Sequence, residues 1–239
     1  MGYHDGVYFF CQAKNHQGGK IVFTIKEFLK AEVKPALGCT EPGAVALAVA
    51  RAREELHGDV ESVMVSVSDS IYKNGVDVGI PGTRGLRGNN VAAALAALCG
   101  KSAYGLEVLK DCSESHAAAA LEMMKKGAVK VTPDMEKHGV YVEASVRAGG
   151  MHALCRIEGT HTGISLVTVD GETRFRAGEP SPSGSSSASK NISDEVSKMG
   201  FTELVSLVDT MDAEDVEYVM SGVDMNMAIA SYGFDSRHR

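Results

Sequence analysis

Cys39 is the residue whose type and position point most directly to chemistry. It lies in segment 34–43, KPALGCTEPG, where two prolines and two glycines predict a tight turn. Residues 44–56 then read as an alanine- and valine-rich helix, with Thr40 as a plausible N-cap and Glu41 in the first turn. Unpaired N–H groups at a helix start lower a thiol pKa and favour the thiolate, which attacks substrates or binds metals. The alternative is a small buried cysteine that only fills the turn.

A glycine-rich stretch over residues 69–90 follows a predicted strand and precedes a predicted helix. Loops of this length inside a compact domain are usually functional or disordered, and the flanking elements favour function. The stretch contains neither the GxxxxGK[ST] pattern of a P-loop nor a GxGxxG fingerprint, so mononucleotide binding is unsupported. Backbone N–H groups at glycines can form an anion site, and four nearby side chains could bind a carboxylate: Ser70, Lys73, Asn74 and Thr83. The alternative is a solvated structural loop.

His161 is the third candidate for chemistry. It lies in the segment 158–162, EGTHT, between two predicted strands, where an imidazole could serve as a general base or an orienting group. The alternative is an exposed histidine in a hairpin turn. The sequence contains no HExxH and no GxSxG pattern, so neither a zinc protease nor a serine hydrolase is indicated.

Three of the other four cysteines read as structural. The sequence has five cysteines, an odd number, without a CxxC pair, in a chain too large to need disulfides for stability. We therefore expect reduced thiols and no disulfide framework. Cys99 and Cys112 fall in predicted alanine-rich helices and Cys155 in a predicted strand, which favours core packing for all three.

Composition narrows the classes of partner. The 239 residues are 44% hydrophobic and 23% charged, the proportions of a globular protein. The formal net charge of -7 disfavours binding to nucleic acid or to an anionic membrane surface. No apolar run approaches the ~20 residues of a membrane-spanning helix, and the N-terminus lacks a signal-peptide core. We expect a cytoplasmic protein.

Periodicity predicts the elements that position these residues. Thr24 and Glu27 form a capping-box pattern that opens a helix ending before Pro35. Helices and one strand come first, then a meander of three or four strands, then helices. This order predicts an α+β fold, with helices packed on a mainly antiparallel sheet and a helical C-terminal segment. The other expected helices span 90–99 and, either broken or continuous, 105–126. The expected strands span 60–68, 140–146, 151–157, 164–169 and 173–175.

Composition shifts divide the chain into four parts. Residues 1–20 lack periodicity and read as a disordered or tag-like arm. Residues 21–175 form the predicted α+β domain, which carries the cysteine turn and the glycine-rich loop. Residues 176–190 are rich in serine and lack an aliphatic run, which is typical of a linker. Residues 191–239 return to helical spacing, and we expect them to pack back on the domain.

Four segments in order resemble the L-cysteine desulfidase family, which is related to the α domain of iron–sulfur-dependent L-serine dehydratases. They are EVKPALGCTEPGAVALA (32–48), SIYKNGVDVGIPGT (70–83), YGLEVLKD (104–111) and EGTHTGI (158–164). The combination of GCTEP, KNG and IPGT is specific, and the resemblance covers residues 25–234.

The resemblance implies an oxygen-sensitive [4Fe-4S] lyase that converts L-cysteine to sulfide, pyruvate and ammonia, or eliminates water from L-serine. Three cysteines hold the cluster in that family, and Cys39 matches the first of them. The resemblance places Lys73 and His161 in catalytic roles. It also places five residues at the substrate: Glu41, Ser70, Asn74, Thr83 and Thr162.

The sequence departs from the resembled family in length. Members are nearly twice as long, and their remaining cluster cysteines lie in the C-terminal half, so this chain corresponds to an N-terminal half with one ligand of three. Because a cluster needs about three or four sulfur ligands, we expect the chain alone to lack both cluster and turnover. Its expected partners are an amino acid and either a C-terminal-half chain or further copies of itself. The alternative is a non-enzymatic amino-acid-binding or oligomerisation module of the same fold.

Overall fold

The computed structural model describes residues 23–178 and 192–235 and divides the chain into two compact units. One unit comprises Pro35–Ser186, and the other combines Met1–Lys34 with Ser187–Arg239. The first carries all the sequence-predicted site residues. The second consists of helices within its described part.

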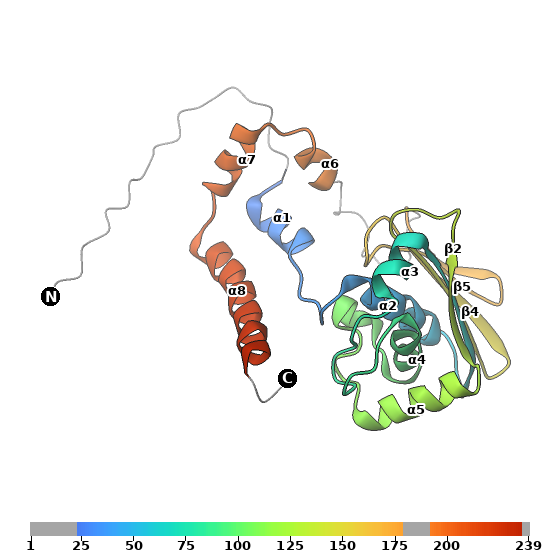
Figure 1. Cartoon of the computed structure of the whole chain (residues 1–239). Helices are drawn as coiled ribbons and strands as arrows, with labels where there is room; N and C mark the ends of the chain where they lie inside the picture. The colour runs from blue at the N-terminus through green and yellow to red at the C-terminus, as the bar shows by residue number, and fades with distance from the viewer. Residues whose placement is uncertain (1–22, 179–191, 236–239) are drawn as a thin grey trace. The chain divides into compact units, whose positions relative to one another are not determined.

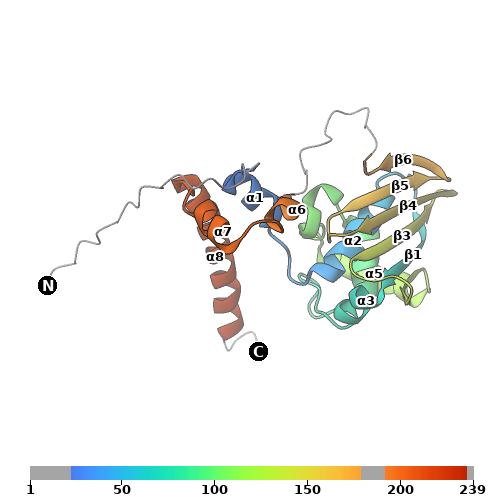
Figure 2. The same cartoon turned by 90° about the horizontal axis from the view of Figure 1, so that it is seen from above.

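A six-stranded sheet forms the centre of the first unit (Figure 2). The strand order is β2-β1-β3-β4-β5-β6, in which β1 and β2 are parallel and all other neighbours are antiparallel. The α+β prediction is therefore confirmed. The strands are β1 (Val60–Ser68), β2 (Val129–Asp134), β3 (Tyr141–Ala148), β4 (Met151–Glu158), β5 (Ile164–Val169) and β6 (Glu172–Arg176).

Strand β2 was not predicted from the sequence. It is short and contains Pro133, which cannot donate a ladder hydrogen bond and therefore argues against a strand in a sequence pattern. The structure resolves the conflict by placing β2 at an edge of the sheet, where it pairs with β1 alone. An edge position tolerates a proline because only one side of the strand is bonded.

Helices cover one face of this sheet (Figure 1). The predicted loop 69–90 begins with a helix, which corrects that expectation. Of the two alternatives for 105–126, the structure shows the broken one: Gly105 adopts a φ of 56° and α5 begins only at Glu114. Gly105 lies within a 3-10 helix (Ser102–Glu107), and residues 108–113 separate that helix from α5. The α-helices are α2 (Thr40–Arg53), α3 (Asp69–Gly75), α4 (Asn89–Cys99) and α5 (Glu114–Lys125).

Small side chains let α2 lie close to the sheet and to α4. Every residue from Ala44 to Ala50 is at most 2% exposed, and α2 contacts β3, β4 and α4. A Cβ atom added to Gly100 would meet Ala96 backbone atoms at 2.8 Å and the Ala50 Cβ at 2.9 Å. A helix that is apolar on all sides belongs in a core, and α2 is the central helix of this one.

Cys99 and Cys112 form a disulfide, which corrects the expectation that both are reduced core thiols. Their Cα atoms are 5.8 Å apart, at a sequence separation of 13. Cys99 ends α4, whereas Cys112 lies in the turn before α5, outside any helix. No CxxC spacing indicates the pair, because the two cysteines belong to separate elements that only the tertiary structure brings together. Cys155 is fully buried on β4, in agreement with core packing.

The second unit contains α1 (Ile25–Glu32), α6 (Ile192–Val196), α7 (Phe201–Val208) and α8 (Ala213–Phe234). The predicted capping box of Thr24 and Glu27 opens α1. A small core of Phe23, Ile25, Leu29 and Leu207 joins α1 to the C-terminal helices, and Lys26 Nζ lies 2.8 Å from Glu214 Oε2.

These contacts correct one predicted boundary. Helix α1 groups with the C-terminal helices and not with the 35–178 unit, because its buried apolar face packs against α7 and α8 residues. The docking of 191–239 on the first unit stays a prediction. The predicted arm 1–20 and residues 179–190 of the predicted linker lie outside the described residues. Within the described ranges, no helix has the length and hydrophobicity needed to cross a bilayer.

The disulfide yields a stability prediction. Replacing both Cys99 and Cys112 by serine should lower the free energy of unfolding by about 3 kcal/mol, because the bond closes a loop of about 14 residues in the unfolded chain. Urea denaturation followed by circular dichroism measures the change. Dithiothreitol should destabilise the wild type by a similar amount and leave the double variant unchanged. An equal effect of the reductant on both proteins would contradict the assignment.

Candidate functional site

Three of the sequence-predicted residues meet at the start of α2. The Cys39 thiol donates to Glu41 Oε2 at 2.7 Å, and Asn74 Nδ2 donates to Glu41 Oε1 at 3.0 Å. The Thr40 hydroxyl approaches Glu41 Oε2 at 3.4 Å. Glu41 is therefore the centre of the group, because both of its carboxylate oxygens accept hydrogen bonds.

Backbone geometry brings these side chains together. Gly38 adopts a φ of 96°, which a side chain disfavours, and the chain then enters α2 with Cys39 at the N-cap position. Helix α3 starts directly after β1 and carries Asn74 in its last turn. The group therefore joins the N-terminus of α2 to the C-terminal end of α3.

The protonation state of this group differs from the sequence prediction. Burial raises the pKa of the Cys39 thiol, and the hydrogen bond to Glu41 raises it further. Backbone N–H groups of Thr40 and Glu41 act to lower this pKa, as expected at a helix start, but burial and the Glu41 carboxylate outweigh them, so the net pKa is raised and not lowered. Burial also acts to raise the pKa of Glu41, but hydrogen bonds from Cys39 and Asn74 outweigh it and hold that pKa below its ordinary value. The resting pair is a thiol and a carboxylate.

His161 lies near this group. It occupies the turn between β4 and β5, is half-buried, and its charge contributes to the lowered pKa of Glu41. Thr162 follows it in the same turn and is also half-buried. The structure thus brings four of the predicted site residues, Cys39, Glu41, Asn74 and His161, to one end of the sheet.

The remaining predicted residues lie elsewhere. Lys73 is exposed on α3, and no hydrogen bond or ion pair joins it to the Cys39 group in the part of the chain that the structure describes. The Ser70 hydroxyl donates to the Gly139 carbonyl at 2.9 Å. The Thr83 hydroxyl is buried, donates to the Ile80 carbonyl at 2.6 Å and accepts from the Leu86 N–H at 3.1 Å. Thr83 therefore stabilises its own loop. To bind a substrate carboxylate as predicted, its hydroxyl would have to give up the hydrogen bond that it donates to Ile80.

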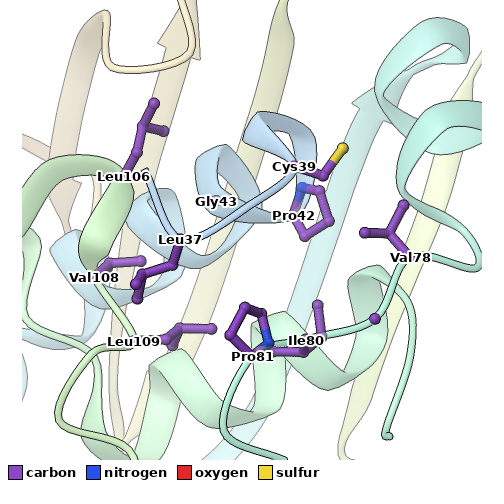
Figure 3. A pocket seen from close by; sticks show the side chains of 11 residues that line it. Leu37, Cys39, Pro42, Gly43, Val78, Ile80, Pro81, Leu106, Val108 and Leu109 are labelled. Atoms are coloured by element: carbon purple, nitrogen blue, oxygen red, sulfur yellow. The ribbon is translucent and has the colours of Figure 1, made fainter. Parts of the chain in front are cut away.

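An apolar pocket beside Cys39 was not found by sequence reasoning (Figure 3). Its cavity volume is about 20 Å³, which is room for one water-sized group. Its walls come from three separate segments, so only the tertiary structure reveals it. The lining side chains are Leu37, Cys39, Pro42, Val78, Ile80, Pro81, Leu106, Val108 and Leu109.

The donors of this site do not complete an iron–sulfur centre. A [4Fe-4S] cluster needs about three or four thiolate ligands. Cys39 is half-exposed and forms no disulfide, whereas Cys99 and Cys112 are joined by one. Burial raises the pKa of the Cys155 thiol to about 12. Over residues 23–178 and 192–235, no three His, Cys, Asp or Glu side chains are grouped as metal ligands. The described residues therefore offer one sulfur at the site and do not fit a whole cluster.

The thiol–carboxylate pair gives a testable prediction. Glu41→Gln removes the negative charge beside Cys39, so the thiol pKa should fall and the midpoint of alkylation by iodoacetamide should move to lower pH. At neutral pH the variant should then react several-fold faster, because more thiolate is present. Mass spectrometry of the peptide that contains Cys39 measures the rate. Glu122→Gln, an exposed carboxylate paired with Lys125 on α5, is the matched control and should react like the wild type. An unchanged Cys39 rate in Glu41→Gln would contradict the pairing.

Comparison of the sequence with curated proteins identifies relatives that are all named UPF0597 proteins. The chain is 42% identical over 213 residues to a UPF0597 protein of Kosmotoga olearia, which covers 88% of this chain and 49% of that protein. It is 38% identical over 207 residues to a UPF0597 protein of Geobacter sulfurreducens, covering 87% of this chain and 48% of that protein. A UPF0597 protein of Clostridium tetani is 38% identical over 211 residues.

The chain thus spans about half the length of the curated relatives it matches. No family model and no solved structure matches it. The chain is similar to one half of the UPF0597 proteins over nearly all of its own length.

Proposed function

We propose that this chain carries part of the active site of a lyase that eliminates sulfide from L-cysteine, or water from L-serine, and yields pyruvate and ammonia. The observation that carries the proposal is the group formed by Cys39, Glu41 and Asn74 with His161 nearby, at the edge of a small apolar pocket. These are residues that the resemblance to L-cysteine desulfidases places at the metal and the substrate.

The reaction needs a base and a stabilised leaving group. A base removes the Cα proton, and the C–S bond breaks with its electron pair leaving on sulfur as hydrosulfide. The aminoacrylate product takes up water and releases ammonia, so L-cysteine and water give pyruvate, ammonia and hydrogen sulfide. His161 and Lys73 are the proposed bases, because an imidazole or an amine can take up a proton from a substrate carbon that lies within its reach.

The polar residues around Glu41 would hold the substrate. A substrate ammonium group can take the place of the Cys39 thiol or the Asn74 amide as the donor to the ionised Glu41 carboxylate. When the ammonium group displaces the Cys39 thiol from Glu41, the sulfur loses its hydrogen-bond partner and becomes available as a ligand. The adjacent pocket accepts one small group, which matches the size of a thiol or hydroxyl substituent on Cβ.

Polypeptide beyond the described residues must complete the site. The resembled family uses a [4Fe-4S] cluster as its Lewis acid, and Cys39 would supply one sulfur to it. The described residues offer no second free thiol near Cys39, and we propose that a second chain or further copies of this one supply the other ligands. We propose that the assembly works in the cytoplasm.

A second candidate function rests on the same observation, that the described residues offer too few sulfur ligands for a cluster. In this candidate, Asn74 and Glu41 bind an amino acid that is not turned over, so the chain is an amino-acid-binding module. The other form of this candidate is an oligomerisation module with the same fold. The hydrogen-bonded state of Cys39, which is a thiol and not a thiolate at rest, favours this candidate over a chain that is active alone.

Complementation tests the lyase proposal. The full chain, mixed anaerobically with the unmatched half of the Kosmotoga olearia relative, iron and sulfide and then desalted, should form pyruvate from L-cysteine or L-serine. The chain alone should form none. His161→Gln should lower turnover by about a hundredfold or more, the size of a lost general base. His138→Gln, an exposed histidine before β3, is the matched control and should retain turnover. A folded complex without turnover would reject the lyase.

Calorimetry separates the two candidates. The binding module should bind L-serine or L-cysteine with micromolar affinity in the absence of iron, and Asn74→Asp should weaken that binding because a second carboxylate would face Glu41. The lyase half should show no such binding by itself. Asn90→Asp, on α4, controls for the charge change.

A further inference from the structure

An exposed apolar surface runs along α7 and α8. We define the α7/α8 surface by the side chains of Phe201, Val205, Val216, Met220, Val223 and Met227, which are 43% to 81% exposed. Single exposed apolar residues are ordinary, but a row of them along one helix indicates an interaction site, and four of these six residues lie on α8. The row therefore requires an occupant.

The spacing on α8 indicates what kind of occupant fits. Val216, Met220, Val223 and Met227 follow one another at steps of four, three and four residues along a 22-residue helix. This seven-residue repeat places them in one stripe, which is the pattern that packs against another helix. At 1.5 Å per residue the helix is about 33 Å long, enough for several turns of contact.

Helix α1 occupies a different part of α8. The Tyr218 hydroxyl donates to the Val33 carbonyl at 2.5 Å, and Lys26 pairs with Glu214 and Asp212. The groove between α1 and α8 ends at Ser221. Beyond it α8 runs past the end of α1 (Figure 1). The exposed residues Val223 and Met227 of the stripe lie in this part of α8.

Charge selects among the possible occupants. Residues 201–235 contain eight Asp and Glu and no Lys, Arg or His. An anionic membrane would repel such a surface, since helices that lie on membranes are rich in Lys and Arg. A second copy of the same surface would place acidic rims against each other, which is unfavourable. The fitting partner is a helix with an apolar stripe and basic residues at its rim.

The relatives supply a polypeptide of the required kind. Each matched UPF0597 protein carries about as much chain outside the matched segment as inside it. We propose that the α7/α8 surface is the docking site for that other half, which packs a helix with a basic rim along Val216–Met227. The inference concerns assembly and goes beyond the chemistry of the proposed function, so complex formation without turnover would support it while rejecting the lyase.

Co-expression tests the proposal. The full chain should co-purify with the unmatched half of the Kosmotoga olearia relative as a one-to-one complex by analytical ultracentrifugation. Met220→Asp and Val223→Asp should each weaken the complex by at least about tenfold, because a charge would be buried in the interface. Met64→Asp, an equally exposed methionine on β1, is the matched control and should leave the affinity unchanged. Affinity should fall as salt concentration rises, since acidic and basic rims meet.

Hydrogen exchange keeps the test decisive if the partner half does not fold by itself. In the full-length Kosmotoga olearia relative, backbone amides aligned with 222–234 should exchange much more slowly than the same segment of this chain alone. Equal exchange in the two proteins would overturn the proposal. A dimer of this chain alone that Met220→Asp dissociates would also overturn it, in favour of a second copy as the occupant.

Discussion

The close packing of α2 against the sheet is the constraint on which the rest of the structure depends. Its residues from Ala44 to Ala50 are almost completely excluded from solvent, and their small side chains bring the helix axis near β3, β4 and α4. Burial of this helix fixes the position of its first turn, and Cys39 and Glu41 stand there. The site is therefore held by the core itself and not by a surface loop that could rearrange. A larger side chain in the middle of α2 would displace the sulfur and the carboxylate together.

Glu41 gives the site its chemical character. It accepts from a thiol and an amide and lies close enough to His161 for the imidazole charge to lower its pKa. The same carboxylate raises the pKa of Cys39, so the sulfur is held as a thiol until a competitor takes its acceptor. A cation or an ammonium group that binds Glu41 removes one cause of the raised thiol pKa. Binding and activation of the sulfur are coupled through one side chain.

Local signals predicted well wherever a short stretch determines its own structure. The capping box of Thr24 and Glu27, the turn before α2 and the antiparallel meander were all readable from residue order. Predictions failed where a distant segment decides the outcome. Pro133 is compatible with β2 only because that strand lies at an edge, and Cys99 meets Cys112 only because α5 and the segment before it fold against α4. The thiol pKa of Cys39 was predicted from the helix dipole alone, whereas burial and Glu41 decide it. Residues far apart in sequence build the pocket, so no motif could reveal it.

The contact of Gly43 with the 3-10 segment has an evolutionary consequence. A Cβ atom at position 43 would stand 3.3 Å from Leu106 Cδ2, tighter than most such contacts. The wall of the pocket is thus set by main chain on one side and by a leucine on the other. Exchange of Gly43 for any other residue would push Leu106 outward, whereas shortening Leu106 would enlarge the cavity at little cost to the helix. Homologues that accept bulkier ligands should therefore differ at position 106 and keep glycine at 43.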